Sequence, residues 1–230
     1  MESMLKFLDW DSQFFEKKIY RLDISKADQI DAIKQLDSNF DGELIYLFSK
    51  EDLNFKNNDQ LLLADKKIVF EKVIIPTEIK IDDSEIISVF ELTDDLLDLA
   101  FLSGHHSRFK LDSKLQHKFK SMYRIWIEKS LTREIAHEVF AYRFDNKNIG
   151  FVTVKRNEDS AVIGLIAVSE HYHGKNIGSA LMKKVEEWCG SNGVKHLEVA
   201  TQLDNVQACN FYKKNGFNTK QIDYIYHYYL

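Results

Sequence analysis

The sequence predicts an α/β (α+β) fold made of a small N-terminal lobe and a larger second domain. Three observations predict it: strand-like runs dominate the chain before Pro76, period-two alternation follows Glu138, and apolar residues recur at helical spacing between Gly178 and Trp188. The chain has 230 residues, of which 44% are hydrophobic, so it is long and apolar enough to bury a core.

The first lobe is predicted to span residues 1–83. It opens with MLKFLDWDSQFFEKKIYRLDI, continues through the helix-patterned stretch ADQIDAIKQLDSNF, and then contains the strand-like runs ELIYLF, QLLLA and KKIVFEKVII. The single proline, Pro76, precedes the acidic run IDDSE, and this change in composition places the boundary near residues 80–86. Trp10, Phe14 and Phe15 offer stacking surfaces for a base, although aromatic residues of a small lobe more often form its core.

The second domain is predicted to span residues 84–230. Ser88 to Leu92 is typical of a strand, and Thr93 can cap a helix TDDLLDLAFLSG whose acidic first turn suits the helix dipole. The segment HKFKSMYRIWIEKSL predicts a second helix. VFAYRF, FVTVKR and AVIGLIAV alternate between apolar and polar residues and are joined by polar turns, which predicts an antiparallel meander.

The remaining elements alternate between helix and strand. Leu181, Val185 and Trp188 share one helical face, and Gly190 and Gly193 are expected to end that helix. HLEVAT then predicts a strand, NVQACNFYKKNG a short helix closed by a glycine, and FNTKQIDYIYHYYL a final strand region.

Composition excludes several classes of function. The formal net charge is −5, so nothing in the total charge attracts nucleic acid or anionic lipid. No apolar run approaches the roughly 20 residues that cross a bilayer, and Met1 to Trp10 lacks the features of a signal peptide, so we expect a cytoplasmic protein. Cys189 and Cys209 read as reduced, helix-borne thiols, and no metal site is indicated.

The segment AVIGLIAVSEHYHGKNIGSALMKKVEEW carries the main chemical signal. A buried strand runs through a short loop into a helix whose first turn has small residues at Gly174, Gly178 and Ser179. Free main-chain N–H groups at a helix start, aided by the helix dipole, can bind a pyrophosphate without basic side chains. The loop is neither a Walker loop nor the dinucleotide-binding fingerprint, because the glycines and lysine are spaced differently.

Two ordered motifs then resemble a known superfamily. VSEHYHGKNIGSAL resembles the acyl-CoA-binding motif of the GNAT acyltransferases, and NVQACNFYKKNGF resembles the motif that follows it there. The resemblance implies a GNAT core with a mixed, mostly antiparallel central sheet flanked by helices, and acetyl-CoA or another short acyl-CoA as co-substrate. The cofactor-binding residues it implies are Ile166, Ala167, Val168, His173, Gly174, Lys175, Asn176, Ile177, Gly178, Ser179 and Asn205.

The motif departs from the usual pattern at two positions. His173 stands where the family has arginine or glutamine, and Asn176 stands where it has glycine, whereas Gly178 matches. Asparagine is the non-glycine residue that most readily accepts a left-handed backbone, and His173 can still donate a hydrogen bond. Lys175 is either a compensating charge near the pyrophosphate or a solvated loop lysine.

A narrower resemblance extends along the whole chain. LDWDSQFF, HHSRFKLD, IGLIAV, VATQLDN and YIYHYY resemble segments of the bacterial dTDP-fucosamine acetyltransferase family and its sugar N-acyltransferase relatives. This implies acylation of the amino group of a nucleotide-linked (dTDP-type) amino-deoxysugar, for cell-surface polysaccharide such as O-antigen. The substrate-binding residues it implies are Arg108, Gln202 and His227. Arg108 would fork onto the sugar nucleotide's pyrophosphate, with a surface ion pair as its alternative.

The implied reaction needs three kinds of group. The family resemblance assigns Tyr212 as the acid that protonates the leaving thiolate, and the main-chain N–H of Val168 as the donor to the developing oxyanion. Asn205 either caps its helix or binds the pantetheine amide. The general base stays open among His105, His106, Glu134, His227 and a bound water. Alternation places His227 with Ile225 and Tyr229, opposite Tyr224, Tyr226 and Tyr228.

Two other functions remain open on the sequence. The acceptor could instead be a free amino acid, a polyamine, an antibiotic or a peptide N-terminus. The chain could also be a non-catalytic acyl-CoA-binding module, against which the retained Tyr212 argues. The sequence does not decide the acyl length, the sugar or the oligomeric state, for which a homodimer is one alternative, and it predicts no nucleic-acid or membrane partner.

Overall fold

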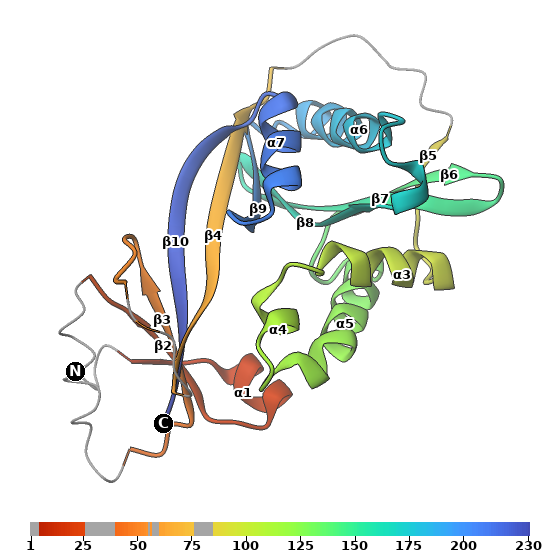
Figure 1. The fold of residues 1–230 in the computed structure, drawn as a ribbon. Helices are drawn as coiled ribbons and strands as arrows, with labels where there is room; N and C mark the ends of the chain where they lie inside the picture. The colour runs from red at the N-terminus through yellow and green to blue at the C-terminus, as the bar shows by residue number, and fades with distance from the viewer. Residues whose placement is uncertain (1–4, 26–39, 55, 57–59, 76–84) are drawn as a thin grey trace.

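The structure is a computed structural model that describes residues 5–25, 40–54, 56, 60–75 and 85–230 (Figure 1). The predicted helix at residues 27–40 and the expected boundary near residues 80–86 lie mostly outside these residues. The elements, in chain order, are β1 (Lys6–Phe7), α1 (Asp9–Phe15), β2 (Ile19–Asp23), β3 (Leu44–Ser49), β4 (Leu61–Val73), β5 (Ile86–Ser88), α3 (Asp94–Ser103), α4 (Arg108–Leu111), η2 (Gln116–Lys118), α5 (Phe119–Leu131), β6 (Glu138–Phe144), β7 (Lys147–Asn157), β8 (Ser160–Val168), η3 (Glu170–Tyr172), α6 (Ile177–Ser191), β9 (His196–Gln202), α7 (Val206–Lys214) and β10 (Asn218–Tyr229).

The described strands form one ten-stranded sheet in the order β1-β2-β3-β10-β4-β9-β8-β7-β6-β5. The β2–β3 and β8–β9 pairs are parallel and the other pairs are antiparallel, so the predicted mixed, mostly antiparallel sheet is confirmed. Strand β4 lies between β10 and β9, so strands from both sides of the expected boundary at 83/84 alternate within the same sheet. The division into two functional domains stays a prediction.

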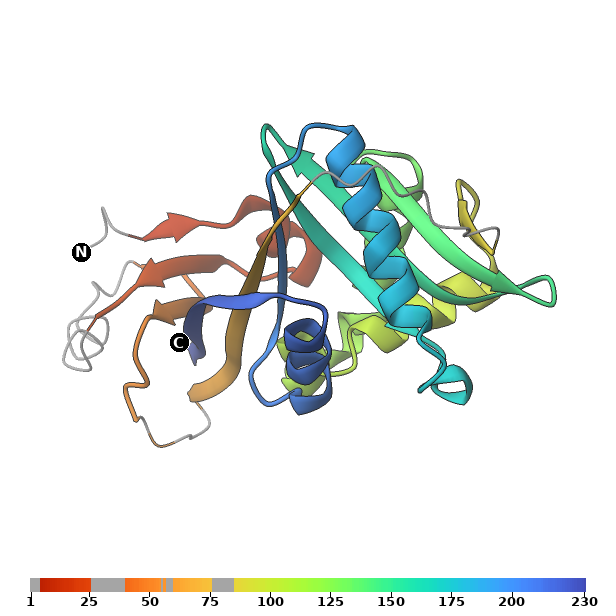
Figure 2. The same cartoon turned by 90° about the horizontal axis from the view of Figure 1, so that it is seen from above.

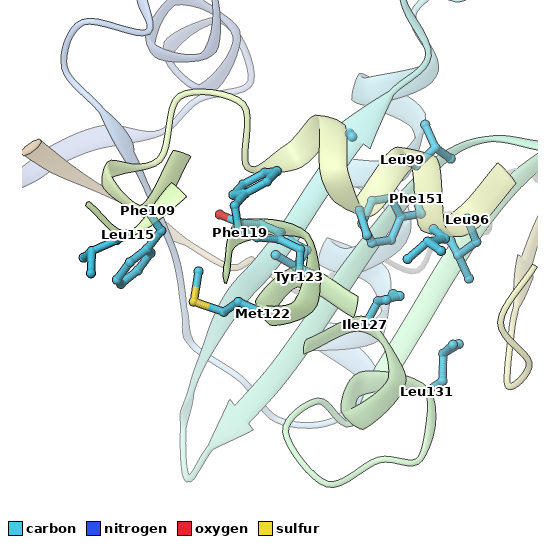
Figure 3. Packing of buried hydrophobic residues seen from close by; sticks show 14 of the residues in the cluster. Leu96, Leu99, Phe109, Leu115, Phe119, Met122, Tyr123, Ile127, Leu131 and Phe151 are labelled. Carbon is cyan, nitrogen blue, oxygen red and sulfur yellow. The ribbon is translucent and has the colours of Figure 1, made fainter. Parts of the chain in front are cut away.

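Helices cover both faces of the sheet. Helices α3 and α5 lie on one side of β7 and β8, and α6 lies on the other side (Figures 1 and 2). On α5, apolar side chains at helical spacing face the sheet and α3, and Figure 3 shows Phe119, Met122, Tyr123 and Ile127 packed in this way. Opposite them, α6 and α7 bury Leu181, Val185 and Tyr212 against the other face of the sheet.

Most predicted elements are present, and the meander VFAYRF, FVTVKR and AVIGLIAV forms β6, β7 and β8. Two predicted strands, QLLLA and KKIVFEKVII, are in fact one long strand, β4. A register shift opposite Ile225 and Tyr226 lets β4 continue through its polar centre. Of the three aromatic residues of the first lobe, Phe15 belongs to the core and Phe14 is partly buried against it, whereas Trp10 is exposed and stacks on Phe14 at 5.0 Å.

Two local predictions were wrong, and a third was right in position only. The strand expected at Ser88 to Leu92 lies earlier, at Ile86–Ser88, because its partner β6 pairs only with those residues. Thr93 is the N-cap residue of α3, but its hydroxyl contacts Asp95 and Asn148 side chains instead of a main-chain N–H group. Gly190 lies inside α6, which ends at Ser191, and only Gly193, with a φ of 70°, follows the helix in a left-handed conformation.

Candidate active site

A cavity of about 370 Å³ lies where the C-terminal end of β8 meets the N-terminus of α6. The loop after α3 and one side of α7 form its other walls. Every predicted cofactor-binding residue lines the cavity except Lys175, and so does Tyr212. The sequence analysis did not select several other lining residues: Leu102, Ser103, Glu170, Tyr172, Gln207, Ala208, Phe211 and Lys214.

The turn between β8 and α6 has the backbone that the sequence predicts. Asn176 is left-handed, with a φ of 60° and a ψ of 9°, and Gly174 has a φ of 77°. The N–H of Ala180 donates to the main-chain oxygen of Asn176 and makes the first helical hydrogen bond. The N–H groups of the three preceding residues therefore lie in the first turn, where an α-helix offers them no internal acceptor. These three residues, Ile177, Gly178 and Ser179, line the cavity.

Gly178 is also required by packing. A Cβ atom at this position would lie 3.0 Å from Cε2 of Phe211, which is tighter than ordinary contact. The absent side chain thus lets the first turn of α6 approach α7 closely.

His173 and Lys175, the two basic residues of the turn predicted to bind cofactor, do not occupy equivalent positions. The Nε2 atom of His173 lies 2.9 Å from the main-chain oxygen of Val168, so the imidazole ties the turn back to the end of β8. Because a carbonyl oxygen only accepts, this nitrogen must carry the proton. The Lys175 ammonium lies 4.8 Å from the ring centroid of Tyr172, and Lys175 is outside the cavity lining.

Strand β8 has an unpaired edge beside the cavity. Its pairing with β9 stops at Ile163 opposite Val199, whereas its pairing with β7 continues as far as Val168. The two strands therefore separate beyond Ile163. Ser169 N–H donates to Ile149 at 2.8 Å, so the next pair along, Gly150 and Val168, is a non-hydrogen-bonded pair. The N–H of Val168 therefore points toward the open edge.

Tyr212 reaches the cavity from α7. The residue is 4% exposed, and its ring packs against Phe70 and Phe217 with centroids 5.6 and 5.9 Å away. Burial raises the pKa of the phenol above its ordinary value, so the hydroxyl stays protonated at neutral pH. Asn205 caps α7 by accepting the Ala208 N–H at 3.1 Å, which is one of its two predicted uses.

The candidate general bases are scattered. His105 and His106 line the cavity, with ring centroids 5.6 Å apart. Glu134 instead forms a 3.1 Å ion pair with Lys129 at the surface and is outside the cavity lining. His227 is also outside it. The two loop histidines are therefore the predicted bases that the structure brings to the cavity.

The three predicted substrate-binding residues lie in a second polar cluster, outside the cavity lining. The guanidinium of Arg108, in α4, lies 4.3 Å from the ring centroid of Tyr46 and 4.6 Å from that of Phe109. Its Nη1 atom is buried without a hydrogen-bond partner, and Arg108 forms no ion pair in the described part of the chain. The alternative of a surface ion pair is therefore wrong for the described residues.

His227, the second of these residues, is fully buried in β10. Its Nδ1 atom lies 2.5 Å from Oδ2 of Asp112, which also accepts the Tyr229 hydroxyl at 2.6 Å. Burial lowers the pKa of His227 to about 4, although the Asp112 carboxylate opposes this shift, so the imidazole is neutral at pH 7. Burial alone would raise the pKa of Asp112, but hydrogen bonds from His227 and Tyr229 outweigh it and lower the pKa. The neutral ring donates Nδ1–H to Asp112 and leaves Nε2 as an acceptor.

The third residue, Gln202, ends β9 and is a polar neighbour of Asp65 on β4. Burial raises the pKa of Asp65 to about 6, against the opposing effects of Arg108 and Gln202. Neither Asp65 nor Asp112 was predicted as a site residue from the sequence. Asp65 carries a signal in hindsight, because it is the first charged residue after the apolar run LLLA, whereas nothing near Asp112 distinguishes it from a surface aspartate.

Cys189 and Cys209 are free, buried and carried by α6 and α7, as predicted. Among the residues that the structure describes, no group of three or more histidine, cysteine, aspartate or glutamate side chains could hold a metal ion. None of the helices in the same residues is both long and apolar enough to cross a membrane.

Curated relatives match parts of the chain. Streptothricin acetyltransferase A of Bacillus subtilis is 35% identical over 95 residues, which are 41% of this chain and 55% of that protein. The spore coat polysaccharide biosynthesis protein SpsD of the same organism is 26% identical over 136 residues, which are 59% of this chain and 47% of that protein. The chain thus spans about half the length of these relatives.

Solved structures share the fold at low sequence identity. A GNAT-family acetyltransferase of Novosphingobium aromaticivorans aligns over 86% of this chain and 79% of its own, with a TM-score of 0.53 and 14% identity. The PaiA N-acetyltransferase of Thermoplasma acidophilum, solved with coenzyme A, aligns over 63% of this chain and 99% of its own, with a TM-score of 0.50 and 19% identity. The family model described as Acetyltransferase (GNAT) family matches residues 100–217, just over half of the chain, and the protein therefore belongs to the GNAT acetyltransferase family.

Proposed function

We propose that this protein transfers an acyl group, acetyl being the expected one, from acyl-CoA to the amino group of a small acceptor. One observation carries the proposal: a single cavity is lined by the first turn of α6, the unpaired end of β8 and the buried phenol of Tyr212. The first turn of α6 and the unpaired end of β8 would bind acyl-CoA, and Tyr212 would supply the proton for the reaction.

The cavity walls suit acyl-CoA. The N–H groups of Ile177, Gly178 and Ser179 meet the requirements of a diphosphate, because they are free donors at the positive end of a helix dipole. The open edge of β8 offers main-chain groups that an extended pantetheine arm can pair with, as an added strand would. Asn205 keeps its amide NH₂ for the same arm while its oxygen caps α7.

The proposed reaction uses few groups. The acceptor ammonium first loses one proton to a base, for which His105 and His106 stand on the cavity wall. The amine nitrogen then bonds to the thioester carbon, and the negative charge on the carbonyl oxygen is met by the N–H of Val168. The carbon–sulfur bond breaks as Tyr212 gives its proton to the departing thiolate. The nitrogen loses its second proton, which restores the phenol directly or through water.

The acceptor we propose is a nucleotide-linked (dTDP-type) amino-deoxysugar of cell-surface polysaccharide biosynthesis. The similarity to SpsD supports a role of this kind. Arg108 supports it as well, because a half-buried guanidinium without an ion-pair partner is suited to a diphosphate. A second acceptor class, another small amine such as an antibiotic, is favoured by the 35% identity to streptothricin acetyltransferase A.

Coenzyme A release from acetyl-CoA, followed with a thiol reagent, tests the proposal against an acceptor panel. We expect turnover with dTDP-fucosamine or a related sugar nucleotide, and calorimetric binding of coenzyme A without an acceptor. Turnover with another amine but with no sugar nucleotide would replace the acceptor and keep the chemistry. Coenzyme A binding without transfer to any amine would indicate a non-catalytic module. No coenzyme A binding would overturn the whole proposal.

A further inference from the structure

A cluster of polar side chains that the proposed chemistry does not use lies on the sheet face below α4. His227 on β10 pairs with Tyr46 on β3, and their rings lie 4.7 Å apart. Asp65 on β4 pairs with Ile225, two residues before His227, so Asp65 and His227 project from the same face of the sheet. Arg108 lies over the ring of Tyr46, and its charge affects the pKa of both Asp65 and His227.

Besides Tyr46, whose hydroxyl is also buried without a partner, three side chains of this cluster each keep one buried polar atom without a hydrogen-bond partner. These atoms are Oδ1 of Asp65, Nη1 of Arg108 and Nε2 of His227. Native proteins pair the great majority of their buried polar atoms, because an unpaired one loses its hydration without compensation. Three such atoms on neighbouring side chains therefore indicate a place where a ligand supplies the partners.

The chemistry of the three atoms restricts that ligand. Arg108 only donates hydrogen bonds, an ionised Asp65 only accepts them, and the neutral His227 presents an accepting Nε2 because its other nitrogen donates to Asp112. One cationic donor is therefore combined with two acceptors. A polyamine would be repelled by the positive charge of Arg108, and it would offer no acceptor for the N–H groups of Arg108. A diphosphate attached to a hydroxylated ring satisfies all three, since its oxygens accept from Arg108 and its ring hydroxyls donate to Asp65 and His227.

The cluster is connected to the cavity along the chain. Arg108 follows His106, which lines the cavity, by two residues. Gln202, the polar neighbour of Asp65, precedes the lining residue Asn205 by three residues. The segment that follows α3 and the segment that begins at the end of β9 therefore each contribute residues to both the cluster and the cavity.

We propose that Asp65 and His227 bind ring hydroxyls of the acceptor's sugar, beside a diphosphate held by Arg108, and that Asp112 is a positioning residue that fixes the His227 tautomer. This inference rests on the proposed function, because it assumes a nucleotide-linked amino sugar as the acceptor. It assigns acceptor recognition to residues of β4 and β10, outside the acyl-CoA cavity.

Steady-state kinetics with dTDP-fucosamine test the inference. Asp65→Asn removes the anionic acceptor, and His227→Asn keeps an amide N–H near the Nδ1 position while removing Nε2. We expect each variant to raise the KM for dTDP-fucosamine about 10- to 100-fold, to change kcat less, and to leave the KM for acetyl-CoA unchanged. Asp98→Asn on α3 and His171→Asn on η3 are matched controls, because both residues are exposed and lie on elements that contribute no residue to the cluster.

A second measurement separates recognition from folding. Nitrogen-15 NMR of the His227 ring should show protonated Nδ1 in the free protein and a shift of the Nε2 signal when dTDP-fucosamine binds. In Asp112→Asn the tautomer preference should weaken and the acceptor KM should rise, with the acetyl-CoA KM unchanged. If His227→Asn does not fold, Asp65→Asn and the NMR titration still decide the question.

The outcomes are distinct. Turnover of dTDP-fucosamine with unchanged acceptor KM in Asp65→Asn and no Nε2 shift would overturn this inference and leave the proposed acceptor standing. Acylation of another amine, with no sugar nucleotide accepted, would overturn both. Coenzyme A binding and acetyl-CoA KM values equal to those of the unmodified protein would show that any acceptor defect is specific.

Discussion

The Nε2 atom of His173 and the main-chain oxygen of Val168 are 2.9 Å apart, and this hydrogen bond links the turn before α6 to the last residue of β8. The two residues belong to the two surfaces proposed to bind acyl-CoA, the helix start and the strand edge. The histidine that replaces the family's arginine or glutamine thus shapes the turn through Val168, and its second ring nitrogen remains for a ligand.

Replacing this histidine should weaken coenzyme A binding moderately. His173→Ala removes one hydrogen bond of the turn, so we expect the calorimetric Kd for coenzyme A to rise about 2- to 10-fold. His171→Ala is the matched control, because His171 lies in the same turn, is exposed and is outside the cavity lining. Equal effects of the two substitutions would contradict a specific role for the His173–Val168 contact.

Tyr212→Phe should separate binding from chemistry. The substitution keeps the packing against Phe70 and Phe217 but removes the proton that the thiolate needs, so kcat should fall by roughly one to four decades with coenzyme A affinity unchanged. Because burial raises the pKa of Tyr212, the unmodified enzyme should show no loss of rate from phenol ionisation below about pH 10. Tyr172→Phe, at the cavity wall, is the control. An unchanged kcat in Tyr212→Phe would remove this residue from the mechanism.

Gly178→Val should damage both the fold and the cofactor site. Even a Cβ atom would meet Phe211 at 3.0 Å, so a branched side chain should push α7 away from α6 and lower the free energy of unfolding by about 1–3 kcal/mol. Urea denaturation and coenzyme A calorimetry measure the two effects. Phe211→Leu in the same chain should restore part of each loss, because it makes room for the new side chain. Absence of any rescue would place the strain elsewhere.

Asp65→Asn should make the protein more stable at neutral pH. Burial raises the folded-state pKa of Asp65 to about 6, above the roughly 3.9 of an unfolded chain, so the ionised carboxylate is disfavoured by folding. Below pH 4 the carboxyl is protonated in both states and the penalty vanishes, whereas it is fully present above pH 6. We expect Asp65→Asn to match the unmodified protein near pH 4 and to gain about 1–2 kcal/mol at pH 7.5 in urea denaturation.

The opposite dependence of the stability difference on pH would assign Asp65 a different role. If the unmodified protein gained stability over Asp65→Asn as the pH rose, Asp65 would be a structural ion-pair partner. A variant that gains stability and loses acceptor affinity would instead fit a residue kept for recognition, since functional polar groups are often retained at a cost in stability.

Local sequence patterns predicted the individual helices and strands better than the order in which the strands pair. The backbone of Asn176 and the helix around Tyr212 could be anticipated, because the turn conformation and the apolar spacing are written in neighbouring residues. The insertion of β4 between β10 and β9 could not, because strand order depends on contacts between residues more than a hundred positions apart. The end of β5 at Ser88 was also not predicted, because the pairing with β6 determines where this strand stops.

In the candidate site, too, the part formed by neighbouring residues was easier to predict than the part formed by distant ones. The turn before α6 is a continuous segment, and all of its predicted residues except Lys175 line the cavity. The second polar cluster draws Asp65, Arg108 and His227 from three distant elements, so the sequence singled out Arg108 and His227 only through family resemblance. Of the two aspartates that were not predicted, Asp65 has a weak signal in the sequence, whereas Asp112 could be found only once its burial was known.

The central position of β4 restricts how this protein can diverge. Its two ladders, to β10 on one side and β9 on the other, join the first part of the chain to the last by backbone hydrogen bonds. A recombination event that exchanged the first 83 residues for a foreign module would have to match both neighbours at once. New acceptor preferences should therefore arise through point substitutions in the cavity wall and the second polar cluster. Co-produced fragments 1–75 and 85–230 should reassemble through these ladders.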